Sequence, residues 1–103
     1  MKIYNKLVRD RIPEIIEKQG KTCHYAVVDD AAYKAALDAK LTEELNEYHA
    51  SGELEELADL LEVIYAIAEF RGETPESLNA LAEKKAIERG RFREKYLLLS
   101  VEE

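Results

Sequence analysis

Residues 43–59 read EELNEYHASGELEELAD, and this stretch decides the fold that we expect. On both sides of it, apolar residues recur every three or four positions, which is the spacing of an amphipathic helix. Ser51 and Gly52 interrupt the pattern, because glycine commonly ends a helix. A break this short favours an antiparallel pair of helices. The sequence therefore predicts a helical hairpin, with helices over about 30–49 and 53–71.

Two further helices are expected outside this hairpin. A short one contains Pro13 in its first turn and ends before Gly20. The other begins with Thr74 as its N-cap and Pro75 at its first helical position, and it ends before Gly90.

Two remaining stretches are expected to be extended. Residues 22–28 (TCHYAVV) are partly β-branched or aromatic, and residues 95–101 (KYLLLSV) follow the last helix without a helix cap. A lone strand leaves its backbone groups unpaired, so we expect these two to pair as a small β-ribbon. The expected fold is a mostly all-α bundle of about four helices with this two-stranded ribbon, in one domain over residues 1–103.

The composition narrows the classes of function. The 103 residues include 15 Lys and Arg against 22 Asp and Glu, a net charge of −7. A net acidic chain is a poor ligand for a nucleic acid polymer or an anionic membrane. Its apolar runs are far shorter than the ~18 residues of a membrane span, and its first residues are too charged for a signal peptide. Cys23 stands alone and forms no intrachain disulfide. We expect a cytoplasmic protein.

The acidic residues of the hairpin are the most informative feature. Residues 41–70 contain nine of them and no Lys or Arg. At about 100° per residue, Glu56 and Asp59 fall within the apolar stripe of their helix, and Glu44 and Glu47 fall within that of theirs. Across the break, Glu47 mirrors Glu56 and Glu44 mirrors Asp59, so the two couples are expected to stand side by side.

Four inward carboxylates need either cations or protons. Burying one unpaired carboxylate costs about several kcal/mol, and a cluster adds mutual repulsion. Oxygen ligands select hard ions, so we expect Mg²⁺, with Mn²⁺ as a substitute. A di-iron site would want Glu-x-x-His, and neither His24 nor His49 stands three residues after a Glu. The alternatives are a solvated helix face and an acidic face paired at an interface.

The motif resembles a known enzyme family. EELNE (43–47) followed by ELAD (56–59) is similar to the EExxE…ExxD signature of the all-α nucleoside triphosphate pyrophosphohydrolases, which include MazG proteins, dimeric dUTPases and phosphoribosyl-ATP pyrophosphohydrolase. YNKLVRDRIPEII (4–16) and KKAIERGRF (84–92) further resemble the phosphoribosyl-ATP pyrophosphohydrolase-like branch. The resemblance covers nearly the whole chain.

The resemblance implies an activity and roles for individual residues. The reaction is cleavage between the α and β phosphates of a nucleotide, which releases pyrophosphate and the monophosphate. Glu44, Glu47, Glu56 and Asp59 match the family's magnesium ligands. Glu43 matches the leading acid of the motif and is a candidate catalytic residue that orients or deprotonates the attacking water. Only eight residues separate Glu47 from Glu56, fewer than the usual MazG spacer, so the substrate stays open.

Basic residues are the candidates for contacting phosphate, since a polyphosphate site needs cations. Lys85 and Arg89 continue an apolar line on the last helix and are candidate catalytic residues; snorkelling stems are the alternative. Lys6, Arg9 and Lys84 are candidate substrate-binding residues. Lys6 and Arg9 could instead pair with the acidic hairpin of a neighbouring subunit. Lys40, four residues before Glu44, is interpreted as an ordinary helical ion pair.

Three functions remain in competition. The first is a Mg²⁺-dependent nucleotide pyrophosphohydrolase, the second is the phosphoribosyl-ATP enzyme of histidine biosynthesis, and the third is a non-catalytic acidic helical module for oligomerisation. An apolar stripe too broad for a short chain to cover (Leu54, Leu57, Leu61 and Ile64) also predicts a homo-oligomer, either a dimer or a tetramer.

Overall fold

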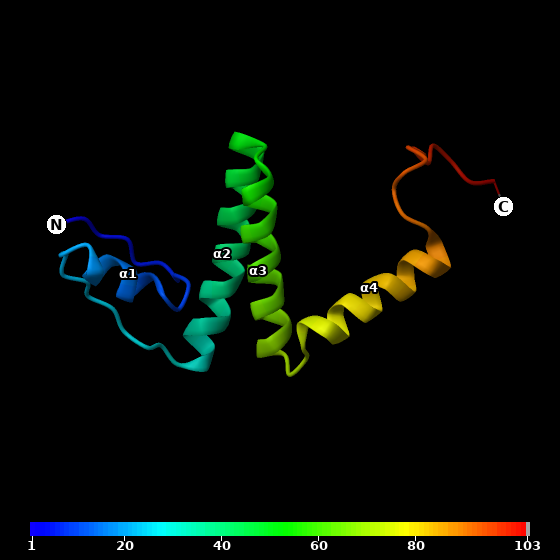
Figure 1. Ribbon diagram of the computed structural model, residues 1–103. Coiled ribbons are helices and arrows are strands. Elements are labelled where there is room, and N and C mark those ends of the chain that lie inside the picture. The colour runs from blue at the N-terminus through cyan, green and yellow to red at the C-terminus, as the bar shows by residue number, and fades with distance from the viewer. Residues whose placement is uncertain (103) are drawn as a thin grey trace.

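The protein is described by a computed structural model over residues 1–102 and contains four helices (Figure 1). They are α1 (Ile12–Lys18), α2 (Asp30–Ser51), α3 (Leu54–Phe70) and α4 (Pro75–Arg89). Residues 1–102 contain no strand, which confirms the all-α class. Each helix of this part of the chain is too short or too polar to cross a lipid bilayer.

The centre of the molecule is the antiparallel hairpin of α2 and α3, as the sequence predicts (Figure 1). Asp29 caps α2, since its side chain accepts a hydrogen bond from the Ala32 N–H at 2.9 Å. Gly52 ends α2 in the left-handed conformation, with φ +68°, and its N–H donates to the Tyr48 carbonyl at 2.7 Å. Glycine reaches this φ without the steric cost that a Cβ brings. The chain therefore reverses within a single short turn.

A thin core fills the space between these two helices. Leu37 of α2 and Val63 and Ala68 of α3 are its buried apolar residues. Near the open end of the hairpin, the rings of Tyr33 and Phe70 meet edge to face, with centroids 5.7 Å apart. This packing fixes the register in which α2 presents its carboxylates to α3.

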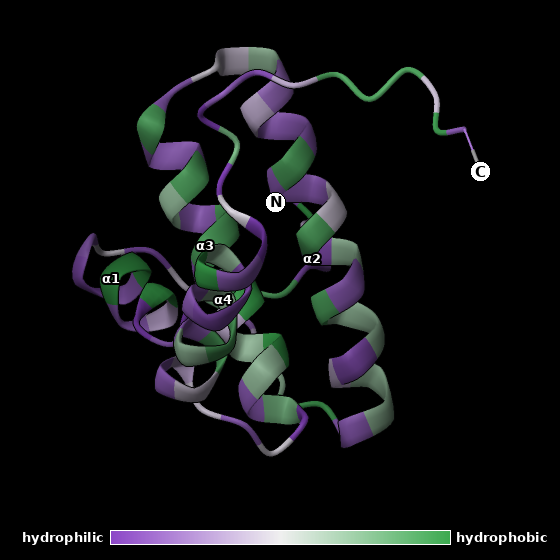
Figure 2. Ribbon diagram, turned by 90° about the vertical axis from the view of Figure 1, so that its right-hand side faces the viewer, coloured by the Kyte–Doolittle hydropathy of each residue, from purple (hydrophilic) through white to green (hydrophobic). Residues whose placement is uncertain are grey.

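Helix α4 is well capped at its N-terminus and then diverges from the hairpin. Thr74 and Ser77 form a reciprocal capping box at its first turn, and Tyr65 of α3 donates a hydrogen bond to Asn79 at 3.2 Å. Among the described helices, α4 contacts α3 alone and then diverges from it (Figure 1). The segment after α4 runs clear of the helices although several of its residues are strongly hydrophobic (Figure 2).

The predicted β-ribbon is wrong. Residues 22–28 form the connection from α1 to α2, and residues 95–101 follow α4, which carries them away from the N-terminal half (Figure 1). Neither segment is a strand. Their β-branched and aromatic composition indicates strand propensity, but a ribbon needs two segments that the helices bring together.

Candidate acidic metal site

The hairpin brings carboxylates from both of its helices to one place. Glu44 comes from α2, and Glu56 and Asp59 come from the first two turns of α3. One carboxylate oxygen of each lies within 4.8 Å of those of the other two. This separation suits three oxygens around a single cation. The juxtaposition follows from the short turn and from the i, i+3 spacing of Glu56 and Asp59 on one helix face.

Glu44 is the buried member of this group. It is only 6% exposed, and its Oε1 lies 3.3 Å from the Lys40 ammonium one turn earlier in α2. Desolvation raises the pKa of the Glu44 carboxyl, the hydrogen bond from Lys40 opposes this rise, and the nearby Glu47 adds to it. The fold therefore holds this carboxylate at a cost that Lys40 only partly offsets.

Two carboxylate oxygens of this group lack a protein donor. Glu44 Oε2 and Glu56 Oε2 are buried and accept no hydrogen bond within residues 1–102. Buried oxygens that lack a donor cost free energy, so they require a cation, a proton or an ordered water. An all-carboxylate donor set with two orphaned oxygens fits a hard divalent ion such as Mg²⁺ or Mn²⁺.

Glu43 and Glu47 form a second group around the same Glu44. One oxygen from each of the three acids lies within 4.8 Å of the other two. Glu43 accepts from Lys6 at 2.9 Å and from Lys40 at 3.4 Å. The hydrogen bond from Lys6 lowers the pKa of Glu43 and, in return, raises that of Lys6. Glu43 is thus held as an ionised carboxylate beside the cluster, while Glu47 is exposed to solvent at its edge.

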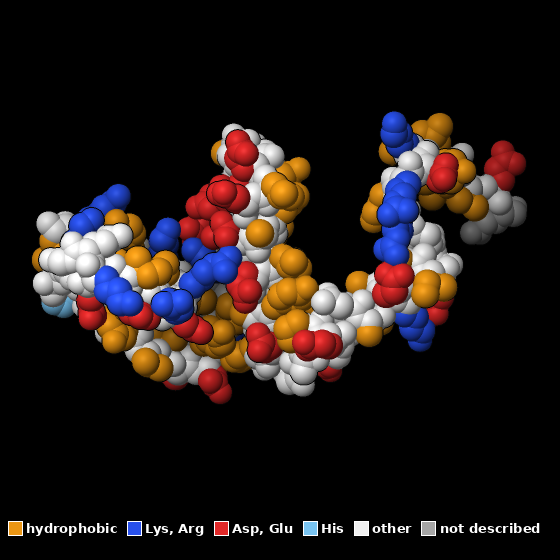
Figure 3. Space-filling model, viewed as in Figure 1, with side chains coloured by type: hydrophobic (Ala, Val, Ile, Leu, Met, Phe, Trp, Pro, Cys, Tyr) orange, Lys and Arg blue, Asp and Glu red, His pale blue; other side chains and the backbone are white. Residues whose placement is uncertain are grey.

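Lys6 and Arg9 reach this acidic face from the N-terminal segment of the same chain. Arg9 Nη2 lies 2.8 Å from Asp59 Oδ1, and Lys6 pairs with Glu43 as described. In Figure 3, blue side chains of the N-terminal part extend to the red carboxylates of α2 and α3. Both residues are candidate phosphate ligands in the sequence, and the structure places both at the site within one protomer.

Lys84, Lys85 and Arg89 lie elsewhere in the protomer. All three are exposed on α4, which does not contact α2 within the described chain. They form no ion pair with any of residues 1–102, whereas Arg91, just beyond α4, pairs with Glu83 at 2.8 Å. A single protomer therefore does not bring these three residues to the carboxylates.

Lys40 is a further cation at the site, and it makes more contacts there than the sequence predicts. Lys40 forms the predicted helical ion pair with Glu44, and it contacts Glu43 as well. Its side chain is mostly buried, at 18% exposed. The i, i+4 spacing reveals one of the two contacts, but no local sequence signal predicts the burial of this side chain.

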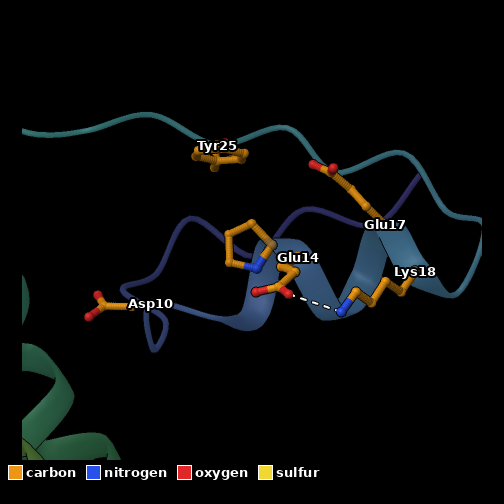
Figure 4. A pocket seen from close by; sticks show the side chains of 6 residues that line it. Asp10, Glu14, Glu17, Lys18 and Tyr25 are labelled. Atoms are coloured by element: carbon orange, nitrogen blue, oxygen red, sulfur yellow. Dashed lines mark ion pairs between the residues drawn. The ribbon is translucent and has the colours of Figure 1, made fainter.

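The hollow beside α1 is separate from this site. It lies between α1 and the connection to α2, with Tyr25 of the connection across from Glu14 of α1 (Figure 4). Its acid Glu14 already pairs with Lys18 at 3.0 Å and with Arg11 at 3.4 Å. The hollow therefore offers no unpaired cluster comparable to the hairpin carboxylates.

Comparisons with known proteins leave the activity open. No protein-family model matches the chain, and no solved structure matches it. An uncharacterized protein of Mycolicibacterium smegmatis is 52% identical over 46 residues, which are 45% of this chain and 47% of the relative. The match spans about half of that relative's length.

Proposed function

We propose that this protein is a Mg²⁺-dependent nucleotide pyrophosphohydrolase, which cleaves the α–β phosphoanhydride of a nucleoside triphosphate-type substrate. The observation that carries the proposal is the buried Glu44 carboxylate, held against Glu56 and Asp59 with two orphaned oxygens. The resemblance of residues 43–59 to the pyrophosphohydrolase signature supplies the reaction class.

Glu44, Glu56 and Asp59 would hold the ion, with Glu47 at the outer edge. When bound, a divalent ion supplies Lewis-acid polarisation of the phosphoryl oxygens and lowers the pKa of a coordinated water. Glu43 is ionised and beside the cluster, so its role would be to orient the attacking water and accept its proton. In this reaction water adds to the α-phosphorus, the bond to the bridging oxygen breaks, and pyrophosphate leaves.

Lys6 and Arg9 would bind the polyphosphate. Each now neutralises a carboxylate of the hairpin, Glu43 and Asp59 respectively. If Asp59 held a metal ion, Arg9 would be free to pair with phosphate oxygens, and Lys6 would reach the same phosphates from beside Glu43. Their positions are exposed enough for such an exchange, at 43% and 55% for the two side chains.

The test is pyrophosphate release, screened over canonical nucleoside triphosphates, deoxynucleotides, damaged nucleotides and phosphoribosyl-ATP with Mg²⁺. We expect pyrophosphate and a monophosphate from at least one substrate, and no release with excess chelator. A clear preference for phosphoribosyl-ATP would assign the biosynthetic enzyme instead of a general pyrophosphohydrolase. Release of orthophosphate alone, or no release from any substrate, would contradict the proposal.

A further inference from the structure

The carboxylates of the hairpin form two groups that share Glu44. One group combines Glu44 with Glu56 and Asp59, and the other combines it with Glu43 and Glu47. Within each group, one oxygen of every acid lies within 4.8 Å of those of the other two. Two groups with a common carboxylate resemble a two-metal site, in which the ions lie about 3.5–4 Å apart. The number of ions therefore depends on which oxygens the protein's own cations already occupy.

Lys40 lies between Glu43 and Glu44 and occupies oxygens of both. Its ammonium is 3.4 Å from Glu43 Oε2 and 3.3 Å from Glu44 Oε1. The other oxygen of Glu43, Oε1, accepts a hydrogen bond from Lys6 at 2.9 Å. Both oxygens of Glu43 and one of Glu44 thus already face a positive charge. A divalent ion bound in this group would lie beside the Lys40 ammonium, and like charges repel.

The two lysines differ in how firmly they are held. The Lys40 side chain is 18% exposed and belongs to the same helix as both of its acids, one turn before them. The Lys6 side chain is 43% exposed and comes from the N-terminal segment. Lys6 is therefore free to turn toward a phosphate, whereas Lys40 stays between the two acids.

Free oxygens remain in the other group. Glu44 Oε2 and Glu56 Oε2 are both buried, and neither accepts a hydrogen bond within residues 1–102. The formal charges lead to the same group size. The two groups contain five carboxylates, and three cations pair with them, namely Lys6, Arg9 and Lys40. The remaining charge of −2 is that which one divalent ion neutralises.

From these observations we infer that the site binds a single divalent ion, in the group of Glu44, Glu56 and Asp59. The Lys40 ammonium replaces a second ion in the group of Glu43 and Glu47. Glu44 serves both cations, since its Oε1 pairs with Lys40 and its Oε2 is unpaired. This assignment rests on the metal site of the proposed function. It leaves Lys6 and Arg9 to neutralise the substrate charge that a second ion would otherwise meet.

Titration with Mn²⁺, followed by electron paramagnetic resonance, counts the ions. The bound ions per chain are obtained from the loss of the sharp signal of free Mn²⁺. We expect the native protein to bind one ion, without magnetic coupling to another. Lys40→Met removes the charge at a similar side-chain length, so this variant should bind two ions with a coupled spectrum. Lys40→Gln keeps a hydrogen-bond donor for Glu44 and should also bind two, and circular dichroism checks the helix content of both variants.

Two further lysine variants show whether Lys40 itself excludes the second ion. Lys34→Met removes an earlier lysine of α2, which pairs with Asp38 at 3.1 Å outside both groups. Lys6→Met frees one oxygen of Glu43 but leaves Lys40 in place. Each of these controls is expected to bind one ion, as the native protein does. Two ions on the native protein, two on either control, or one on the folded Lys40 variants would overturn the inference.

These counts do not depend on catalysis. If the native protein binds one uncoupled ion but hydrolyses no nucleotide, the inference holds and the proposed function fails. If it releases pyrophosphate and binds two coupled ions, the function holds and the inference fails. A native protein that binds no ion would overturn both.

Discussion

Arg9 Nη2 lies 2.8 Å from Asp59 Oδ1, across fifty residues of chain. This ion pair joins the N-terminal segment to Asp59, one of the carboxylates that we propose as metal ligands. A guanidinium and a divalent ion would compete for the charge of Asp59, so we expect the segment to lower the affinity of the proposed site for a metal ion.

Replacing Arg9 with alanine is expected to raise the Mg²⁺ affinity of the nucleotide-free protein. An exposed ion pair contributes about 0.2–1 kcal/mol, so the gain should be no more than about fivefold. Isothermal titration calorimetry measures it. Arg11→Ala is the matched control, since Arg11 pairs with Glu14 of α1 and with no carboxylate of the site. Equal affinities for native protein and Arg9→Ala would show that the ion pair does not oppose the metal.

Addition of Mg²⁺ or Mn²⁺ is expected to stabilise the fold. An ion that binds the native state alone adds about 2.7 kcal/mol to the free energy of unfolding at 100 times its dissociation constant. For a domain of this size, each kcal/mol raises Tm by about 4–8 °C. Thermal denaturation with chelator and with KCl at matched ionic strength provides the baseline. No shift at millimolar Mg²⁺ would favour the non-catalytic helical module.

Glu44→Gln is expected to stabilise the metal-free protein while removing the response to Mg²⁺. The variant replaces a buried charged group, one of whose oxygens has no donor, with a neutral amide. The free energy of unfolding should therefore rise by about 1–3 kcal/mol, which raises Tm by at least about 4 °C. Glu62→Gln, on an exposed position of α3, is the control and should change neither quantity.

The gain in stability that we expect from Glu44→Gln should depend on pH. Burial raises the pKa of Glu44 in the folded state, so ionisation penalises the fold at pH values above that raised pKa. The penalty disappears as the pH falls below the unfolded-state value of 4.5. The two unfolding curves should therefore converge in acid. A variant that is less stable than the native protein at neutral pH would contradict the assigned cause.

The helices could be predicted from the sequence because their signals are local. Thr74–Pro75 at the start of α4 and Gly52 at the end of α2 act through capping and backbone conformation within a few residues. The convergence of Glu44 with Glu56 and Asp59 follows from the same local information, since one short turn fixes which faces of α2 and α3 meet.

What the sequence does not reveal are contacts between distant segments. The Arg9–Asp59 pair depends on how the N-terminal segment folds back over α2, which no periodic pattern encodes. The ribbon of residues 22–28 and 95–101 fails for the same reason, because propensity describes each segment but not whether α4 brings them together. Lys85 and Arg89 follow an apolar line that indicates burial, yet in the protomer both are exposed.

Glu56→Gln provides the sharpest test of the catalytic assignment. Glu56 presents a buried, orphaned oxygen beside Glu44, whereas its neighbour Glu55 is exposed on the same turn of α3. An amide keeps the shape of Glu56 but removes the charge that would hold the proposed ion, so pyrophosphate release should fall by about 100-fold or more with helix content unchanged. Glu55→Gln makes the same chemical change one residue away and should retain native turnover. Activity in Glu56→Gln comparable to that of Glu55→Gln would mean that the hairpin carboxylates do not perform the reaction.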